Sequence, residues 1–225
     1  MPGFGRQRYS DRRQAGRRLA EELGDLAGTR PVVLGLARGG VPVAAEVATA
    51  LGAELDVLVV RKLGAPGNPE FAFGALAEGG GPYLNQPTVH SLAISDAELA
   101  AAIAHAEEQI AARVERFRSG RPLELADRVV LVVDDGLATG ATARAALRAV
   151  RAQHPARLVL AVPVGAPETV EALAAEADEI ICPLQPFDMW AVGAWYEHFG
   201  QVSDEEVVAC LSGAPAADPP RGLRP

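Results

Sequence analysis

Apolar residues occur in short runs without polar alternation, the pattern of strands that are covered on both faces of a sheet. These runs cover residues 32–37, 55–60, 129–133, 157–164 and 179–182. Apolar residues at helical spacing lie near them, at 11–26, 41–51, 141–150, 167–177 and 203–211. Because strand-like runs and helical segments follow one another in turn along the chain, the sequence predicts an α/β fold with a mostly parallel sheet of about five strands flanked by helices.

A further helix interrupts this order. Ser95 and Glu98 have the spacing of a capping box, and an alanine-rich stretch follows to Arg118. We predict a long amphipathic helix, inserted at about 95–118 between core strands, for which dimerisation and covering of a site both stay open. No histidine has a second ligand at metal-site spacing, so packed or exposed positions are expected for His90, His105, His154 and His198.

Composition restricts the class of protein. With 225 residues and 49% hydrophobic content, a single domain over 1–211 is expected, and the residues at 212–225, rich in Pro, Ala and Gly, predict a disordered tail. Two cysteines, no apolar run of about 18 residues and no signal-peptide pattern favour a cytoplasmic location without a membrane partner. The net charge of -8 disfavours a nucleic-acid partner.

One apolar run leads into two adjacent carboxylates and a short turn of glycines and threonines. Residues 129–142 read Val-Val-Leu-Val-Val-Asp-Asp-Gly-Leu-Ala-Thr-Gly-Ala-Thr. Ligands of parallel α/β sheets bind beyond the carboxyl ends of strands, where Asp134 and Asp135 are expected. Backbone N–H groups and the hydroxyls of Thr139 and Thr142 can bind an anion at the start of the next helix. Together these groups predict a site for a sugar phosphate.

Other interpretations of this segment have less support. Asp-Asp-Gly is common in ordinary turns, so an Asx turn without a ligand is the simplest alternative. Receiver-type signalling domains have acidic pairs near the chain start, but they lack the Gly/Thr turn. The sequence has neither a Walker A motif nor Gly-x-Gly-x-x-Gly, which removes the main support for P-loop NTPases and dinucleotide-binding proteins. A phosphohydrolase with Asp134 as nucleophile would normally carry Asp-x-Asp.

The segment resembles the motif of type I phosphoribosyltransferases that binds phosphoribosyl pyrophosphate (PRPP). The resemblance implies that Asp134 and Asp135 hold the 2- and 3-hydroxyls of ribose and contribute to a Mg²⁺ site, largely through PRPP and water. It also implies that the 5-phosphate is bound by Gly136, Leu137, Ala138, Thr139, Gly140, Ala141 and Thr142. The 6-oxopurine branch has an Asp at the position of Ala138. The loop is therefore more similar to the adenine-type branch, and hypoxanthine or guanine becomes a less expected substrate.

A second turn between strand and helix contains Arg38-Gly39-Gly40. Glycine lets the backbone approach an anion, and arginine can bind phosphate bidentately. The resemblance implies that Ala37, Arg38, Gly39 and Gly40 contact the pyrophosphate or its magnesium. Many such loops in the family carry a non-proline cis bond, so we expect the Ala37–Arg38 peptide to be able to adopt it.

Arg61 and Lys62 open a segment rich in Gly and Pro, the kind of segment that is either functional or simply exposed. Val-Arg-Lys-x-Gly resembles the start of the catalytic loop in adenine-type enzymes. The resemblance implies that Arg61 and Lys62 lie toward the pyrophosphate and that Glu78 handles the proton of the acceptor. Residues 71–77 can return as a strand, and we expect residues 61–78 to form a mobile lid with few apolar anchors.

Five of the chain's eleven aromatic residues lie between positions 187 and 199. Such a cluster either packs a small subdomain or stacks on a planar ligand. In the resembled family this region is the hood over the nucleobase, which implies a hood subdomain mainly at 183–202, with base contacts from Phe187, Asp188 and Trp190.

The N-terminal region is rich in arginine. A solvated helix face and a source of cations for a polyanionic ligand are both open for Arg6, Arg8, Arg12, Arg13, Arg17 and Arg18. Glu21, Glu22 and Asp25 continue the same helix, which disfavours a mitochondrial targeting peptide.

The resemblance implies a Mg²⁺-dependent phosphoribosyltransferase that transfers the phosphoribosyl group of PRPP to a ring nitrogen of a nucleobase-like heterocycle and releases pyrophosphate. A homodimer is compatible with this interpretation. The alternative is a non-catalytic regulatory protein of the same fold that binds PRPP or a nucleotide.

Overall fold

The computed structural model describes residues 8–213, and its centre is a sheet of five parallel strands in the order β2-β1-β6-β7-β8. In chain order the strands are β1 (Val32–Leu36), β2 (Glu54–Leu58), β6 (Val129–Val133), β7 (Arg157–Ala161) and β8 (Glu179–Ile181). The predicted α/β class and the parallel sheet are confirmed. The carboxyl ends of all five strands lie at one edge, where ligands bind in such folds.

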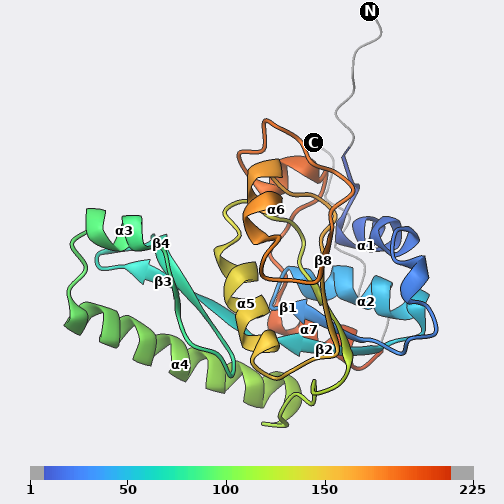
Figure 1. Cartoon of the computed structure of the whole chain (residues 1–225), viewed down its shortest axis with the longest axis horizontal. Helices are drawn as coiled ribbons and strands as arrows, with labels where there is room; N and C mark the ends of the chain where they lie inside the picture. Colours follow the sequence, from blue (N-terminus) through green and yellow to red (C-terminus); the bar gives the residue numbers. More distant parts are fainter. Residues whose placement is uncertain (1–7, 214–225) are drawn as a thin grey trace, which may run out of the picture.

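Helices cover both faces of this sheet (Figure 1). On one face α1 (Arg12–Glu21) and α2 (Gly40–Leu51) pack on Val33, Leu131 and Val159. On the other face α5 (Ala141–Arg151) and α6 (Pro167–Leu173) pack on Leu34, Val132 and Leu160. Neighbouring strand residues point to opposite faces, so the uninterrupted apolar runs follow from burial on both sides.

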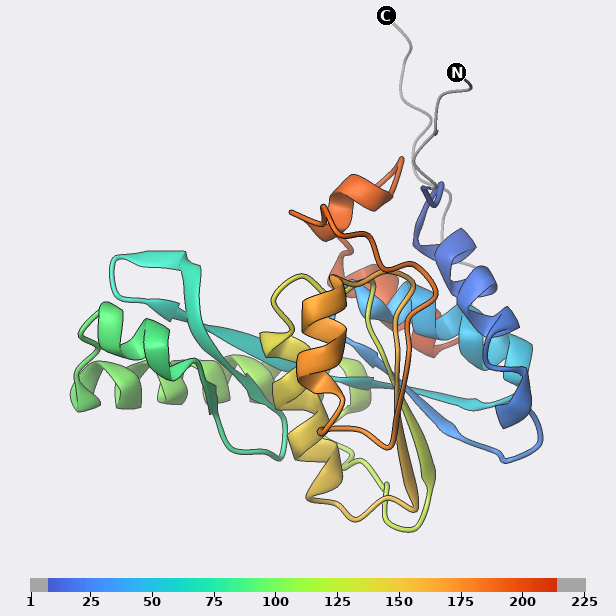
Figure 2. The same cartoon turned by 45° about the horizontal axis from the view of Figure 1, so that its top comes forward.

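The segment after β2 forms an arm that extends from the central sheet, as Figures 1 and 2 show. Strands β3 (Val60–Ala65), β4 (Asn68–Ala77) and β5 (Tyr83–Leu84) form an antiparallel sheet. A short helix α3 (Gln86–Ser91) precedes the long helix α4 (Asp96–Arg118), which lies along β3 and β4. The predicted capping box is present, since Ser95 and Glu98 exchange hydrogen bonds.

The arm corrects one expectation from the sequence. Residues 61–78 do not lack apolar anchors, because Leu63 and Phe73 are fully buried against the Ala106 and Ile110 face of α4. The pair β3–β4 was not predicted as a hairpin, because its bulge near Gly64 and its turn at Gly67 resemble breakers in the sequence. Whether the arm moves when ligand binds stays a prediction.

The remaining elements complete the cover of the sheet. They are the 3₁₀ helices η1 (Gly24–Leu26) and η2 (Val192–Trp195) and the helix α7 (Asp204–Leu211). In the predicted hood, Trp195 and Tyr196 pack with Tyr9 in a small core of their own. Of the predicted tail at 212–225 only Ser212 and Gly213 are described, and residues 214–225 lie outside the described part, as do residues 1–7. No helix in residues 8–213 combines the length and apolar character needed to cross a membrane.

Candidate active site

A cavity of about 430 Å³ lies at the carboxyl edge of the sheet. It brings together the carboxylates Asp134 and Asp135, the loop 136–142 that follows them, residues 37–39, and Lys62 from the arm. The two acids follow β6, residues 37–39 follow β1, and these strands are neighbours in the sheet. The geometry therefore joins most of the predicted site in one place.

The acidic pair is held by hydrogen bonds on several sides. The backbone N–H of Asp135 donates to Oδ1 of Asp134 at 2.9 Å. The Tyr196 hydroxyl donates to the backbone carbonyl of Asp135 at 2.6 Å, and Nε of Arg12 donates to Oδ2 of Asp135 at 2.8 Å. The pair is thus oriented before any ligand arrives.

The electrostatic environment differs between the two acids. Burial raises the pKa of Asp134 well above its usual value, and the neighbouring Asp135 raises it further. Burial also raises the pKa of Asp135, but the Arg12 guanidinium opposes that shift. Lys62 lowers the pKa of both acids. Two carboxylates with incomplete cationic compensation attract hydroxyl donors or a cation.

The predicted phosphate loop runs from Gly136 to Thr142 and leads into α5, which begins at Ala141. Gly140 has a left-handed conformation with φ +72°, and a Cβ there would lie 2.7 Å from Cγ2 of Thr169. The Thr169 hydroxyl donates to the carbonyl of Ala138 at 2.7 Å, which fixes the middle of the loop. All seven predicted residues line the cavity. Their backbone at a helix N-terminus suits a phosphate group.

The second loop approaches the acids closely. The Ala37–Arg38 peptide bond is cis, as predicted. A Cβ at Gly39 would collide with the Asp135 carboxylate, and one at Gly40 would lie 2.5 Å from the Val133 carbonyl oxygen. Gly39 lines the cavity, whereas Gly40 is buried behind it as the first residue of α2. Only glycine permits this distance between the two loops.

The predicted cations occupy different positions. Lys62 is exposed and lines the cavity, and Arg38 lines it while forming an ion pair with Asp204 at 3.4 Å. Arg61 does not line this cavity but an adjoining one between β3 and α4. The three predicted cations are therefore distributed along one path that leads away from the acidic pair.

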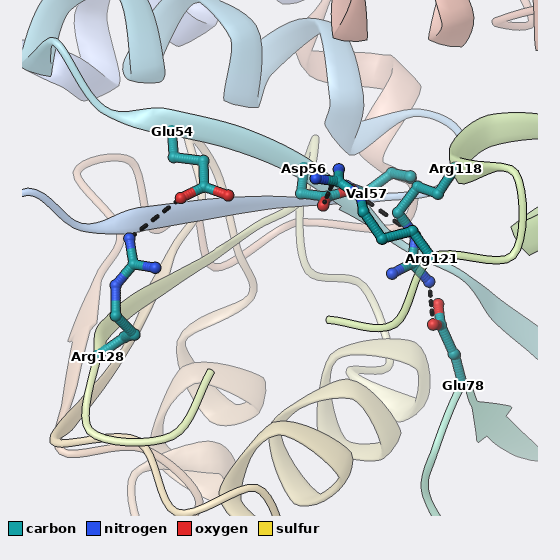
Figure 3. Close-up of polar contacts among 7 residues, drawn as sticks. All are labelled: Glu54, Asp56, Val57, Glu78, Arg118, Arg121 and Arg128. Carbon is teal, nitrogen blue, oxygen red and sulfur yellow. Dashed lines mark hydrogen bonds and ion pairs between the residues drawn. The ribbon is translucent and has the colours of Figure 1, made fainter. Parts of the chain in front are cut away.

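Among the described residues that line the cavity Glu78 does not occur, contrary to the expectation from the sequence. Glu78 lies beside Arg118 instead (Figure 3). Its carboxylate forms an ion pair with Arg118, whose side chain is 1% exposed. Arg118 also faces Asp56 at 3.7 Å, and Arg121 reaches Asp56 at 3.2 Å. The residue stands at the end of β4, where the arm meets the central sheet, so its observed partners are structural. Its role as the group that handles the proton of the acceptor stays a prediction.

The predicted base contacts also lie apart from the cavity. Phe187 is 94% exposed, Trp190 is 77% exposed, and among the described residues that line the cavity neither they nor Asp188 occur. Their contact with a base stays a prediction, and it requires the segment around 187–190 to approach the cavity. Of the five aromatic residues, Phe199 is the one that lines it.

Sequence reasoning left open the residue that most directly orders the acids, Arg12. Besides Asp135, its guanidinium donates to the carbonyl of Gly200 at 2.7 Å and lies 3.8 Å from the centre of the Phe199 ring. The signal in the sequence was the arginine cluster that follows Asp11. Asp11 caps α1, because its side chain accepts a hydrogen bond from the backbone N–H of Gln14. Nothing in that cluster distinguished Arg12 from Arg13, which pairs with Glu46 instead.

The donor set fits a magnesium ion only in combination with a ligand. Within residues 8–213 no group of three or more His, Cys, Asp and Glu side chains could form a metal site. Two adjacent carboxylates are available, and Asp135 already binds Arg12. Mg²⁺ commonly takes one or two carboxylates together with waters and substrate phosphates. Asp134 and Asp135 therefore suit Mg²⁺ that arrives with a phosphate ligand.

A parallel α/β sheet with a cavity at the carboxyl ends of its strands defines the class of α/β proteins that bind ligands at this edge. The phosphoribosyl transferase domain model matches residues 7–198, and the chain belongs to this family. It is 47% identical over 224 residues to two Mycobacterium tuberculosis proteins, of strains CDC 1551 / Oshkosh and H37Rv, which bear the provisional name phosphoribosyl transferase.

Those alignments cover 94% of this chain and 51% of the relatives, so the chain spans about half the length of the curated relatives it matches. The crystal structure of TT1426 from Thermus thermophilus is 49% identical in sequence. Its alignment covers 92% of this chain and 100% of that chain, with a TM-score of 0.75.

Proposed function

We propose that the protein transfers the phosphoribosyl group of PRPP to a ring nitrogen of a nucleobase-like heterocycle and releases pyrophosphate. The observation that carries this proposal is the cavity in which Asp134, Asp135 and the loop 136–142 face Arg38, Gly39 and Lys62. Acceptors for sugar hydroxyls, donors for a phosphate and cations for a leaving group lie there side by side.

In this proposal the acidic pair binds the ribose and the loop binds its 5-phosphate. Ionised Asp134 and Asp135 accept hydrogen bonds from the 2- and 3-hydroxyls, and these bonds are charge-assisted. Arg12 and Tyr196 hold Asp135 in place from two sides. Binding of hydroxyl donors favours the charged form of the acids, which opposes the effect of burial on their pKa.

Transfer then depends on charge that develops at ribose C1 and on the leaving group. The bond from C1 to the pyrophosphate oxygen breaks, the bond from C1 to the acceptor nitrogen forms, and the proton of that nitrogen passes to the released pyrophosphate or to solvent. Arg38 and Lys62 would stabilise the negative charge of the pyrophosphate. Bound Mg²⁺ would supply further neutralisation of that charge. Fixed charges are effective here because they need no reorganisation during the step.

The acceptor class follows from the loop rather than from the hood. Ala138 stands where the 6-oxopurine branch has an acid, so adenine-like or other heterocyclic acceptors are expected before hypoxanthine or guanine. Among the described residues that line the cavity, Glu78 does not occur. That placement favours the second candidate, a regulatory protein that binds PRPP or a nucleotide without turnover.

One experiment separates the two candidates. The protein is incubated with Mg²⁺, PRPP and a panel of purines, pyrimidines and related heterocycles, and pyrophosphate release is measured alongside PRPP binding by calorimetry. Release that depends on one class of base supports the transferase. Tight PRPP binding with no release for any acceptor supports the regulator. Absence of PRPP binding contradicts the transferase and the PRPP-binding form of the regulator.

A further inference from the structure

The Arg12 guanidinium connects the predicted hood to the acidic pair. Its central carbon lies 3.8 Å from the centre of the Phe199 ring, and Nη1 donates to the Gly200 carbonyl at 2.7 Å. Nε of the same group donates to Oδ2 of Asp135 at 2.8 Å. The end of the hood segment 183–202 is therefore linked through Arg12 to an acid that binds ribose in the proposed function.

The Phe199 ring is itself held in place. Its centre lies 4.9 Å from that of the Tyr196 ring, with 33° between the two planes, and a Cβ at Gly193 would lie 2.8 Å from Cδ1 of Phe199. Tyr196 is 4% exposed, and its hydroxyl donates to the backbone carbonyl of Asp135 at 2.6 Å. Hood residues thus contact the backbone of Asp135 directly and its carboxylate through Arg12.

The cation and the ring come from two segments that are paired by backbone hydrogen bonds. The N–H groups of Glu197 and His198 donate to the carbonyls of Tyr9 and Ser10 at 2.8 and 2.9 Å. One side of this pairing continues to the cation at the start of α1, and the other continues directly to the ring. The pairing therefore fixes the position of the ring relative to the cation.

Stacking on a planar acceptor is the other role open to a ring that lines the cavity. Phe199 is 36% exposed, but the Arg12 guanidinium lies over its face, and the Arg12 side chain is only 12% exposed. A cation over an aromatic ring contributes more when both are withdrawn from water. An acceptor on that face would have to displace the cation, so the contacts favour support of Arg12 over stacking.

We propose that Phe199 is a positioning residue, which holds Arg12 in the orientation that orders the Asp135 carboxylate. This inference rests on the proposed function, in which that carboxylate binds a ribose hydroxyl. A Cβ at Gly39 would collide with Oδ2 of Asp135, the same oxygen that Arg12 binds. Arg12 and the Gly39 turn thus confine Oδ2 and leave the other carboxylate oxygen for the ribose. PRPP affinity then depends on the hood before any acceptor is present.

The test measures PRPP binding with Mg²⁺ by calorimetry in the absence of any acceptor. Phe199→Leu is expected to weaken binding about fivefold, because without the ring Arg12 can turn away from Asp135. Phe199→Tyr keeps the ring and should bind PRPP as the wild type does. The matched control is Phe71→Leu, which removes a 51% exposed ring of β4 outside the cavity lining and should leave PRPP affinity unchanged.

A double variant separates action through Arg12 from a general effect on the structure. Arg12→Ala combined with Phe199→Leu should bind PRPP no more weakly than Arg12→Ala alone, because the ring then has no cation to position. Losses that add in the double variant, or equal weakening by Phe199→Tyr and Phe199→Leu, would contradict the proposal. Urea unfolding checks that each variant is folded. Phe199→Met, which also lacks a ring, takes the place of Phe199→Leu if that variant does not fold.

The outcomes keep this inference separate from the proposed function. If the wild type binds PRPP and a folded variant without the ring binds it equally well, Phe199 does not position Asp135, while the proposed function stands. If the wild type does not bind PRPP, the proposed function fails and this inference fails with it.

Discussion

Two groups of partly or fully buried carboxylates in the described part of the chain differ in what faces them. Asp134 and Asp135 stand at the edge of β6 with one direct cationic partner, Arg12, and an open cavity in front. Asp56 and Glu78 stand where the arm joins the sheet, and arginines close around them (Figure 3).

Burial raises the pKa of the acids in both groups. The shift alone therefore does not distinguish a binding site from a structural ion pair. The difference lies in compensation: Arg118 opposes the pKa shift of both Asp56 and Glu78. For Asp134 the charge of Asp135 is the largest influence on the pKa after burial and acts in the same direction, while the backbone N–H of Asp135, Arg12 and Lys62 oppose the shift more weakly. An acid that its own fold compensates poorly is the better candidate for binding a ligand.

The largest expected effect is that of removing Arg118, the cation that Asp56 and Glu78 share. Arg118→Met leaves Asp56 and Glu78 buried without their shared cation, and loss of one partner from a buried pair costs about 3 to 5 kcal/mol. We expect a decrease of that size in the free energy of unfolding, measured with urea at pH 7. The deficit should shrink as pH falls through the folded-state pKa values of Asp56 and Glu78, which burial raises above their ordinary values, because both acids then become protonated in the folded protein.

Arg121→Met is the matched control. Its side chain is 66% exposed although it pairs with the same Asp56, so its loss should cost no more than about 1 kcal/mol. Equal destabilisation by the two substitutions would mean that burial of Arg118 does not matter, and the structural role assigned to this group would be wrong.

Replacement of the acidic pair Asp134 and Asp135 should weaken ligand binding and leave the fold intact. Replacing Asp134 and Asp135 together by Asn removes the charges that accept ribose hydroxyls, and we expect a loss on the order of a few kcal/mol in the free energy of PRPP binding. The fold should persist, since Asn retains the shape of Asp. Calorimetry with PRPP and Mg²⁺ measures the loss, and circular dichroism checks the fold. Unchanged affinity in a folded variant would place the sugar site elsewhere.

Replacement of Arg12 should reduce PRPP affinity, but by less than replacement of the two acids. Arg12→Ala releases the Asp135 carboxylate and removes the contact with Phe199, and we expect PRPP affinity to fall about tenfold. Arg12→Lys should lose nearly as much, since an ammonium cannot bind Asp135 and Gly200 while stacking on the ring. Arg13→Ala, one position along α1, breaks a pair with Glu46 and should leave PRPP affinity unchanged. Equal losses from Arg12→Ala and Arg13→Ala would indicate a general effect of charge.

The contrast also explains what could be predicted from the sequence. Asp134, Asp135 and the phosphate loop are contiguous, and a single strand-to-helix turn positions them, so local pattern and chemistry were sufficient. The same holds for the parallel sheet, whose apolar runs report burial on both faces. The group around Arg118 unites residues 56, 78, 118 and 121 from distant parts of the sequence, and nothing local records their contact.

The arm could not be predicted from the sequence either, because its hairpin depends on long-range packing. Gly64 and Gly67 are breakers in isolation, but in the fold they form a bulge and a turn of a hairpin whose inner face α4 covers. Arg12 was one of several arginines on a helix, and its contact with Asp135 depends on how α1 docks beside β6. Such contacts follow from tertiary geometry, which sequence spacing does not contain.

The last prediction concerns the effect of Asp134 on how the free energy of unfolding depends on pH. It compares the two groups of acids directly. Asp134 has a folded-state pKa raised by burial and by Asp135, above the value of about 3.9 in an unfolded chain. Between these two pKa values the folded state binds more protons than the unfolded state, so the free energy of unfolding falls as pH rises through that window. Asp134→Asn removes this titration. We expect the variant to be more stable than the wild type at pH 8.

Thermal unfolding of both proteins at pH 8 and near pH 3.5 measures the difference, which should become small at the lower pH because Asp134 is then largely protonated in both states. The control Asp25→Asn replaces an exposed acid outside the cavity lining and should not stabilise the protein. If Asp134→Asn is more stable at pH 8 and binds PRPP more weakly, the charge of Asp134 destabilises the fold but serves ligand binding. The acids beside Arg118 differ, because that cation compensates their charge within the fold. Equal stability of variant and wild type at both pH values would show that Lys62 and Arg12 already compensate Asp134, and the distinction between the two groups of acids would then be lost.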